Sequence, residues 1–207
     1  MRILIFGDSI TYGAWDTEAG WVERIKREAH RQTILSEGKN KLQVINLGIG
    51  GDTSTKILKR MPAEIEARYS ASWPFVFLIT FGANDERIMN DKIETPMEKF
   101  ETNVREIVTI AKSHSDKILF LGIPPIGKPV VEFKGQEYSD ERVKEYEQKL
   151  QTIVEDAGLL FVPIRPAFEA AGLDNLYAYD DIHPNNKGHQ LIADTVKPIL
   201  DRFLAGE

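Results

Sequence analysis

Residues 2–13 have the sequence RILIFGDSITYG, in which a run of apolar side chains ends at a glycine, an acid and a hydroxyl. The run itself, 2–6, and a second run at 75–81 are apolar almost throughout. Such runs are typical of strands that are buried on both faces of a parallel sheet. Shorter runs at 43–47, 117–123 and 159–164 predict three further strands.

Segments with a 3.6-residue apolar period lie between these runs and predict helices. Their apolar positions are Trp21, Val22, Ile25 and Ala29; Ile57, Leu58, Met61 and Ile65; Phe100, Val104, Ile107 and Val108; Val143, Tyr146, Leu150 and Ile153; and Leu191, Ile192, Thr195, Val196 and Ile199. Residues 95–98, TPME, predict a capping box with proline at the first helical position. Gly158 is placed to end the fourth helix. We expect Pro62 to break the second helix and Pro198 to kink the last.

The alternation of strands and helices predicts right-handed crossovers and a mainly parallel sheet with helices on both faces. The fold class is therefore α/β. No internal repeat or linker divides the chain, so we expect one domain over residues 1–207. The longest irregular stretch, 124–138, follows the fourth strand and is expected to be a loop that shapes the site. Its Lys128, Phe133 and Lys134 are expected to help select the substrate.

The charge balance disfavours nucleic acid as a partner. With 26 basic and 32 acidic residues the net charge is −6, which repels anionic polymers. The densest basic cluster, 24–27, falls on an amphipathic segment and is interpreted as a solvated face. The chain has no cysteine, which excludes disulfides, thiol catalysis and zinc–thiolate sites.

Nothing in the sequence predicts insertion into a membrane. No apolar run approaches the roughly 20 residues that a membrane-spanning helix needs. The apolar stretch 3–6 is too short for the core of a signal peptide. We therefore expect no integral membrane association and a cytoplasmic location, and the oligomeric state stays open.

Unusual residues follow three of the predicted strands and precede the last helix. These segments are 7–13 (GDSITYG), 46–54 (NLGIGGDTS), 82–85 (GAND) and 180–184 (DDIHP). In a parallel sheet, ligands collect outside the carboxyl ends of the strands. The four segments are therefore expected to lie along one edge of the sheet and to form a site there.

The residue types in these segments suit nucleophilic catalysis. A serine hydroxyl such as Ser9 is a poor nucleophile unless a base takes its proton, and neutral imidazole is the usual base near pH 7. His183 is one of only four histidines. Asp180 stands three residues before it, close enough to accept a hydrogen bond from the other ring nitrogen.

Acyl transfer also needs donors for the oxyanion of its tetrahedral intermediate. The backbone N–H groups of Ser9 and Gly51 and the side-chain amide of Asn84 are available from three strand ends. Gly51 has no side chain, so its backbone can approach a substrate closely.

These four segments resemble the sequence blocks of the GDSL, or SGNH, hydrolases, a family of esterases, lipases, thioesterases and carbohydrate deacetylases. The blocks occur in the family's order and span nearly the whole chain, although Ile10 stands where the family usually has leucine. The resemblance implies a three-layer α/β/α sandwich with a five-stranded parallel sheet in the flavodoxin-like order 2-1-3-4-5. It also implies a serine esterase with the catalytic residues Ser9, Asp180 and His183 and an oxyanion hole of Ser9, Gly51 and Asn84. Neither a metal nor an organic cofactor is implied.

Several other polar and aromatic residues are interpreted as structural. Asp8 and Asp52 are expected to hold a loop or cap a helix, and Asp181 to be solvated. His30 and His114 are expected at the surface, and His189 in packing or at the surface. For Tyr12, Trp15 and Trp21, lining a pocket and packing in the core are both open.

Alternative functions are open as well. Hydroxyls after the first strand could bind the phosphate of a flavin, although Asp8 would place a negative charge beside it. Asp8, Asp180, Asp181 and His183 with Asn84 could instead hold the metal of a phosphoesterase. Within the esterase interpretation the substrate is a small-molecule ester, and short acyl esters, acetylated carbohydrates, lysophospholipids and acyl thioesters are not distinguished.

Overall fold

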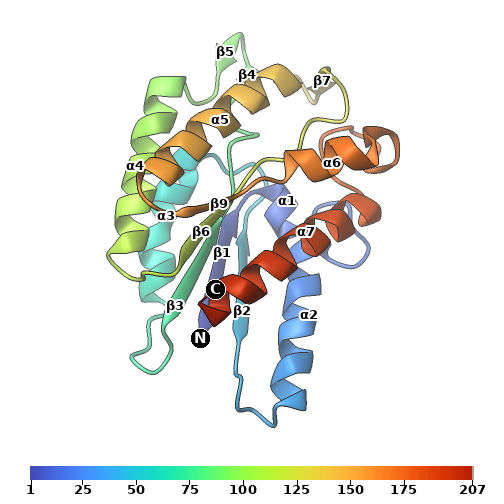
Figure 1. Ribbon diagram of the computed structural model, residues 1–207. Helices are drawn as coiled ribbons and strands as arrows, with labels where there is room; N and C mark the ends of the chain where they lie inside the picture. The colour runs from blue at the N-terminus through green and yellow to red at the C-terminus, as the bar shows by residue number, and fades with distance from the viewer. Residues whose placement is uncertain (207) are drawn as a thin grey trace.

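The computed structural model describes residues 1–206, and its centre is a five-stranded parallel sheet (Figure 1). The strand order is β2-β1-β3-β6-β9. These strands are β1 (Arg2–Gly7), β2 (Gln43–Gly48), β3 (Phe75–Ile79), β6 (Ile118–Leu121) and β9 (Leu160–Val162). Each coincides with one of the five predicted strands, and in chain order the arrangement is 2-1-3-4-5. The predicted α/β class and strand order are therefore confirmed.

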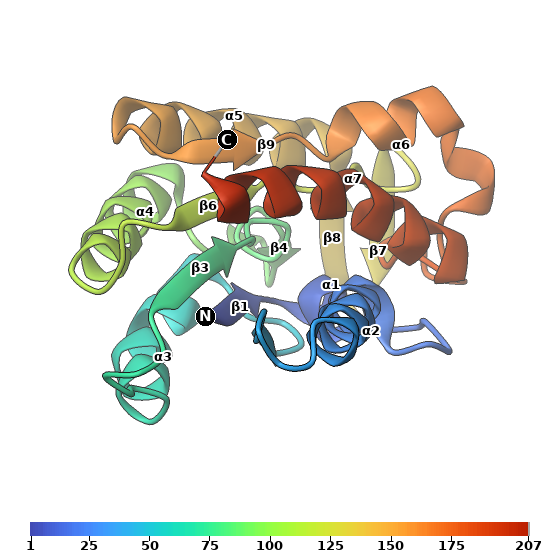
Figure 2. The same ribbon diagram turned by 60° about the horizontal axis from the view of Figure 1, so that its bottom comes forward.

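Helices cover both faces of this sheet and make three layers (Figure 2). One face carries α3 (Ser54–Glu66), α4 (Met97–Lys112) and α5 (Asp140–Asp156), and the other carries α2 (Gly20–Leu35), α6 (Arg165–Ala171) and α7 (Asn186–Ala205). Successive strand residues point to opposite faces, so Phe6 packs in the first apolar core and Ile5 in the second. The short helices α1 (Ser9–Tyr12) and η1 (Leu173–Asn175) and the helix α6 were not predicted, because each is too short to show an apolar period.

The helix ends follow the sequence expectations in part. Gly158 has φ of 71° and comes directly after the C-cap of α5, as predicted. Pro62 lies inside α3 and does not break it, and α7 likewise runs through Pro198. Buried side chains on either side of Pro62 hold α3 against the sheet, and this tertiary packing offsets the lost hydrogen bond.

The predicted capping box at 95–98 is wrong. Helix α4 begins at Met97, Pro96 is its N-cap residue, and no side chain caps it. Thr95 is buried, and its backbone N–H donates to the carbonyl oxygen of Asp85 at 3.0 Å. Thr95 therefore stabilises the loop after β3 and does not cap the helix.

A second, antiparallel sheet lies at the carboxyl end of the central one, in the order β5-β4-β8-β7 (Figure 1). Its strands are β4 (Ile88–Met89), β5 (Lys92–Ile93), β7 (Val130–Phe133) and β8 (Gln136–Ser139). The expectation that 124–138 is irregular is therefore confirmed for 124–129 and wrong for 130–138. Strands β7 and β8 form a hairpin whose two turn residues, Lys134 and Gly135, both have positive φ, as a tight hairpin turn requires. Four-residue strands give too short a pattern to be recognised.

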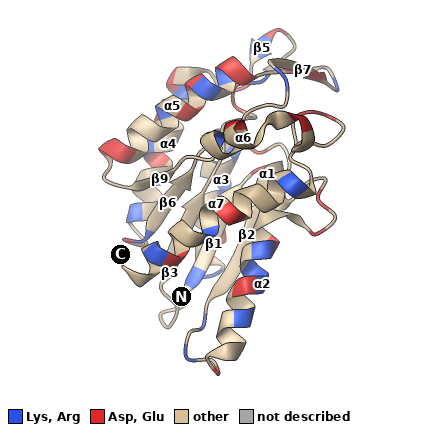
Figure 3. Cartoon of the chain, turned by 45° about the vertical axis from the view of Figure 1, so that its right-hand side comes forward, with Lys and Arg blue, Asp and Glu red and all other residues tan. Residues whose placement is uncertain are grey.

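The basic cluster of α2 is neutralised by neighbouring acids. Arg24 pairs with Asp16, Arg27 lies 2.8 Å from Glu18, and Lys26 lies 3.3 Å from Glu23. Figure 3 shows basic and acidic residues interspersed along α5 and α7 as well. The interpretation of residues 24–27 as a solvated face holds for Arg27, whose side chain is 60% exposed, and is wrong for Arg24, whose side chain is 8% exposed and forms a buried ion pair with Asp16. Over residues 1–206, no helix combines the length and hydropathy needed to span a membrane.

Candidate active site

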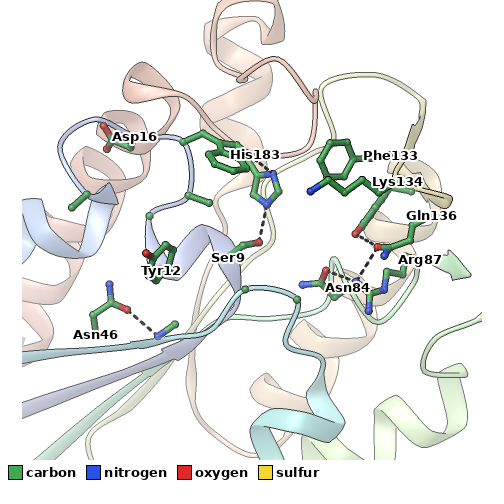
Figure 4. A pocket seen from close by; sticks show the side chains of 18 of the residues that line it. Ser9, Tyr12, Asp16, Asn46, Asn84, Arg87, Phe133, Lys134, Gln136 and His183 are labelled. Carbon is green, nitrogen blue, oxygen red and sulfur yellow. Dashed lines mark hydrogen bonds between the residues drawn. The ribbon is translucent and has the colours of Figure 1, made fainter.

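The site begins where β1 ends. Asp8 is the N-cap of α1 and its Oδ1 accepts a hydrogen bond of 2.9 Å from the backbone N–H of Ile10, so the structural interpretation of Asp8 is confirmed. Gly7 allows the tight turn, because a Cβ atom there would collide with Thr11 and with the carbonyl oxygen of Thr80. Ser9 is consequently held at the first position of α1, at the carboxyl edge of the sheet (Figure 4).

A chain of two hydrogen bonds joins Ser9 to His183 and Asp180 across 174 residues of sequence. Figure 4 shows the first of them, between Ser9 and His183. Nε2 of His183 lies 2.9 Å from Oγ of Ser9, and Nδ1 lies 2.8 Å from Oδ2 of Asp180. The other carboxylate oxygen, Oδ1, accepts the backbone N–H groups of Ile182 at 3.1 Å and His183 at 3.0 Å. The loop before α7 thus fixes both the acid and the ring.

The carboxylate of Asp180 is buried, yet it stays ionised. Burial by itself would raise the pKa of Asp180, but hydrogen bonds from the ring and backbone of His183 outweigh it and lower this pKa to about 2. A permanent negative charge beside Nδ1 favours the tautomer that carries its proton on Nδ1. In that tautomer, Nε2 is free to accept a proton from Ser9.

Ser9, Gly51, Asn84 and His183 line one cavity of about 1180 Å³. Gly51 has φ of 76°, so this position favours glycine on backbone grounds. Among residues 1–206, the backbone N–H groups of Ser9 and Gly51 have no hydrogen-bond acceptor. Two free donors therefore accompany the hydroxyl of Ser9 in the cavity.

The side chain of Asn84 is oriented from both ends. Its Oδ1 accepts a hydrogen bond of 3.3 Å from Nη1 of Arg87, and its Nδ2 donates to the carbonyl oxygen of Asp52 at 3.0 Å. The amide nitrogen is thereby held towards the loop that contains Gly51 (Figure 4). Nδ2 also makes a longer contact of 3.4 Å with Oδ2 of Asp8, so a ligand oxygen would compete with Asp8 for the second N–H group.

Asp85 ties the loop of Asn84 to the loop of Gly51. Its Oδ1 accepts from Oγ of Ser54 at 2.6 Å and from the backbone N–H of Ser54 at 3.0 Å. Burial raises the pKa of Asp85 to about 7, although the hydrogen bonds from Ser54 oppose this shift. The acid that follows Asn84 thus holds the ends of β2 and β3 together.

The remaining predicted residues divide between structural and cavity positions. Tyr12 and Trp15 line the cavity, whereas Trp21 is buried in the core. Asp181 pairs with Lys128 at 2.5 Å and does not line the cavity. Asp52 pairs with Arg60 at 2.7 Å, as expected of a structural acid.

The other histidines lie away from the chain of hydrogen bonds. His30 and His114 are exposed, as expected. His189 is fully buried, and burial lowers its pKa to about 4, which keeps the ring neutral. Its Nε2 lies 3.2 Å from the carbonyl oxygen of Ala14, so His189 packs beneath the loop between α1 and α2.

Several cavity residues were not predicted. Arg87, Gln136 and Tyr138 line the side formed by the small sheet, together with Phe133 and Lys134, which the sequence had suggested. Lys128 is absent from this lining. Arg87 stands only three residues after Asn84 and could have been suspected from that proximity, but Gln136 carries no local signal because the hairpin brings it there.

No set of three or more His, Asp or Glu side chains within residues 1–206 is arranged to hold a metal ion. The set proposed for a metal phosphoesterase is divided: Asp8 caps α1, Asp181 pairs with Lys128, and Asp180 is used by His183. The metal-dependent alternative therefore lacks its group of ligands.

Comparison with known proteins shows the family of this chain. The pattern of the GDSL-like lipase/acylhydrolase family matches residues 5–191. An isoamyl acetate-hydrolyzing esterase of Saccharomyces cerevisiae is 24% identical over 98% of this chain and 87% of its own. A GDSL esterase/lipase of Arabidopsis thaliana is 27% identical over 96% of this chain and 85% of its own. The crystal structure of a lipase/acylhydrolase from Enterococcus faecalis superimposes with a TM-score of 0.75 at 25% identity, covering 98% of this chain and 95% of the other. The chain belongs to the GDSL-like lipase/acylhydrolase family of ester-hydrolysing enzymes.

Proposed function

We propose that this protein is a serine esterase that hydrolyses small carboxylic esters through an acyl-enzyme, with Ser9, His183 and Asp180 as its catalytic triad. The observation that carries the proposal is the continuous chain from Oγ of Ser9 through His183 to Asp180, at 2.9 and 2.8 Å. Nucleophile and base within hydrogen-bond reach, with the base oriented by a third group, form the arrangement that activates a serine. The proposed catalytic unit is one domain over residues 1–207.

The proposed first step is attack of Oγ of Ser9 on the ester carbonyl while Nε2 of His183 takes the hydroxyl proton. The carbonyl oxygen becomes negative and receives the N–H groups of Ser9 and Gly51 and the amide of Asn84. His183 then returns the proton to the leaving alcohol as the carbon–oxygen bond breaks. Water repeats the sequence on the acyl-enzyme and releases the acid, with His183 first as base and then as acid.

The proposed substrates are short acyl esters, including acetylated alcohols and carbohydrates. The cavity is open, and its lining combines the aromatic rings of Tyr12 and Trp15 with the polar groups of Arg87 and Gln136 (Figure 4). A relative that covers most of this chain is named for hydrolysis of isoamyl acetate, which supports a short acyl group. The proposed reaction uses neither a metal ion nor an organic cofactor.

The direct test is labelling with a serine-directed fluorophosphonate. We expect one label per chain, located on Ser9 by mass spectrometry of the digested protein, and loss of ester hydrolysis in proportion to labelling. The activity would be measured with p-nitrophenyl esters of increasing acyl length and with acetylated sugars. Label on another residue, or full hydrolysis after complete labelling, would contradict the proposal.

Replacing Asn84 with alanine is expected to lower kcat by about 10²–10³-fold and to change KM little. The amide faces an oxygen that becomes fully negative only in the tetrahedral state, so its loss weakens the transition state more than the ground state. Steady-state kinetics with one activated ester measures both constants. Asn175→Ala, an exposed site outside the cavity, is the matched control. A kcat within threefold of the wild type would mean that the backbone donors alone stabilise the oxyanion.

A further inference from the structure

Trp15 makes a contact with the His183–Asp180 pair that its sequence position does not suggest. Its indole Nε1 donates to Oδ2 of Asp180 at 2.7 Å, the same oxygen that faces Nδ1 of His183. Nε1 also lies 3.2 Å from Nδ1, and the indole meets the imidazole edge-on, with ring centroids 5.9 Å apart. The shorter distance and the charge on Oδ2 direct the indole N–H to the carboxylate.

We propose that Trp15 is a positioning residue for the His183–Asp180 pair, which rests on the proposed function of that pair. Asp180 then has all four of its acceptor positions filled: two by backbone N–H groups at Oδ1, one by His183 and one by Trp15 at Oδ2. The indole N–H fixes the plane of the carboxylate. Trp15 is 50% exposed and lines the cavity together with His183.

Contacts with α7 and the local backbone conformation hold Trp15 in this place. The backbone of Trp15 has φ of 65°, which a non-glycine residue adopts only when its surroundings impose it. Helix α7, which follows His183, fastens the loop: Nε2 of His189 contacts the carbonyl oxygen of Ala14, and Nδ2 of Asn186 donates to Oγ1 of Thr17 at 2.6 Å. Helix α7 therefore holds the loop of Trp15 and also follows directly after the segment that contains the His183–Asp180 pair.

Sharing Oδ2 between two donors has a chemical consequence. The indole N–H neutralises part of the charge on the carboxylate, so Asp180 stabilises a protonated His183 less than it would alone. Removal of the indole N–H should therefore make protonation of His183 more favourable. It should also allow the carboxylate to rotate about its bond to the chain, which misplaces the base.

The test is Trp15→Phe, which keeps an aromatic ring over the pair and removes only the N–H and part of the ring. We expect the acid limb of the kcat/KM profile to move to higher pH by about 0.5 unit, which is a fraction of the roughly 1–2 units that a hydrogen bond to a charged group represents. On the plateau we expect kcat to fall on the order of 10-fold, less than a 1 Å displacement of a catalytic group can cost. An acid limb that stays in place, whatever the change in kcat, would overturn the proposal.

Trp73→Phe is the matched control, because Trp73 lies against Arg2 at the opposite end of β1 and β3. We expect its profile to coincide with that of the wild type. The titratable groups that face His183 from other elements are Asp8 at the end of β1 and His189 on α7. Neither is replaced in Trp15→Phe, so a shift specific to this variant reports the indole N–H.

Indole N–H resonances provide a second measurement that does not depend on catalysis. The chain has three tryptophans, so ¹⁵N-labelled protein gives three signals, assigned with the two Trp→Phe variants. We expect the signal of Trp15 to shift in Asp180→Asn while that of Trp73 stays in place. A Trp15 signal that is unchanged in Asp180→Asn would overturn the contact even if Trp15→Phe did not fold. If Ser9→Ala retained activity, the proposed function would fail, and this measurement would still test Trp15 against Asp180.

Discussion

Replacing Ser9 with alanine is expected to lower kcat for ester hydrolysis by at least about 10⁵-fold. Oγ of Ser9 is the hydroxyl that Nε2 of His183 faces, at 2.9 Å, and without it no acyl-enzyme can form. Residual hydrolysis would come from water activated by His183 beside the backbone donors of Ser9 and Gly51. Initial rates with an activated acetate ester, at high enzyme concentration, would measure both the loss of kcat and the residual hydrolysis.

The fold should not suffer from this change, and thermal unfolding of the variant would verify that. Ser113→Ala is the matched control, because Ser113 is exposed at the end of α4 and far from the cavity lining. We expect that variant to retain wild-type kcat. Hydrolysis by Ser9→Ala within tenfold of the wild type would remove Ser9 from the mechanism.

The second large effect is expected from Asp180→Asn, with kcat lowered on the order of 10⁴-fold. An amide nitrogen at the position of Oδ2 would face both Nδ1 of His183 and the indole of Trp15. It would donate to Nδ1, place the ring proton on Nε2 and stop Nε2 from accepting the proton of Ser9. With the amide reversed, its nitrogen would instead face the backbone N–H groups of Ile182 and His183.

The pH dependence of this loss separates it from a general disturbance. Because hydrogen bonds hold the pKa of Asp180 at about 2, the carboxylate is ionised in the folded protein at every pH above about 4. The ratio of wild-type to variant kcat should therefore stay constant over the pH range in which both enzymes are on their plateau. At lower pH the two acid limbs should differ, because the carboxylate stabilises the protonated ring of His183. A ratio that varies across the plateau would show that Asp180 titrates in this range and is not a permanent anion.

Asp181→Asn is the control that the chain itself offers. The two acids are adjacent in sequence, but Asp181 pairs with Lys128 and does not line the cavity. We expect this variant to keep kcat within twofold of the wild type, about the uncertainty of such a surface change. An equal loss in both variants would point to the loop as a whole instead of to the hydrogen bond with His183.

The sequence by itself determined the alternating architecture and the candidates for the reacting groups. The runs at 2–6 and 75–81 are apolar almost throughout because both faces of β1 and β3 are buried. A strand that is buried on both faces has apolar side chains at consecutive positions, which can be read from the sequence directly. The three polar segments that follow strands likewise offered Ser9, Gly51 and Asn84 as candidates from their local context. The strand order came from the family resemblance, since periodicity does not say which strands are neighbours.

Only the tertiary structure decided which groups meet. Trp15 was undecided between core and pocket, because a lone aromatic in a loop has no period, and its partner Asp180 is 165 residues away. Strands of four residues in the hairpin β7–β8 bring Gln136 to Arg87 at 3.1 Å without a local signal. Pro62 was expected to break α3, but packing of its neighbours in the core outweighs the local penalty. A short stretch of sequence indicates the burial and the backbone preference of its own residues. Contacts between distant segments depend on tertiary packing, which no such stretch contains.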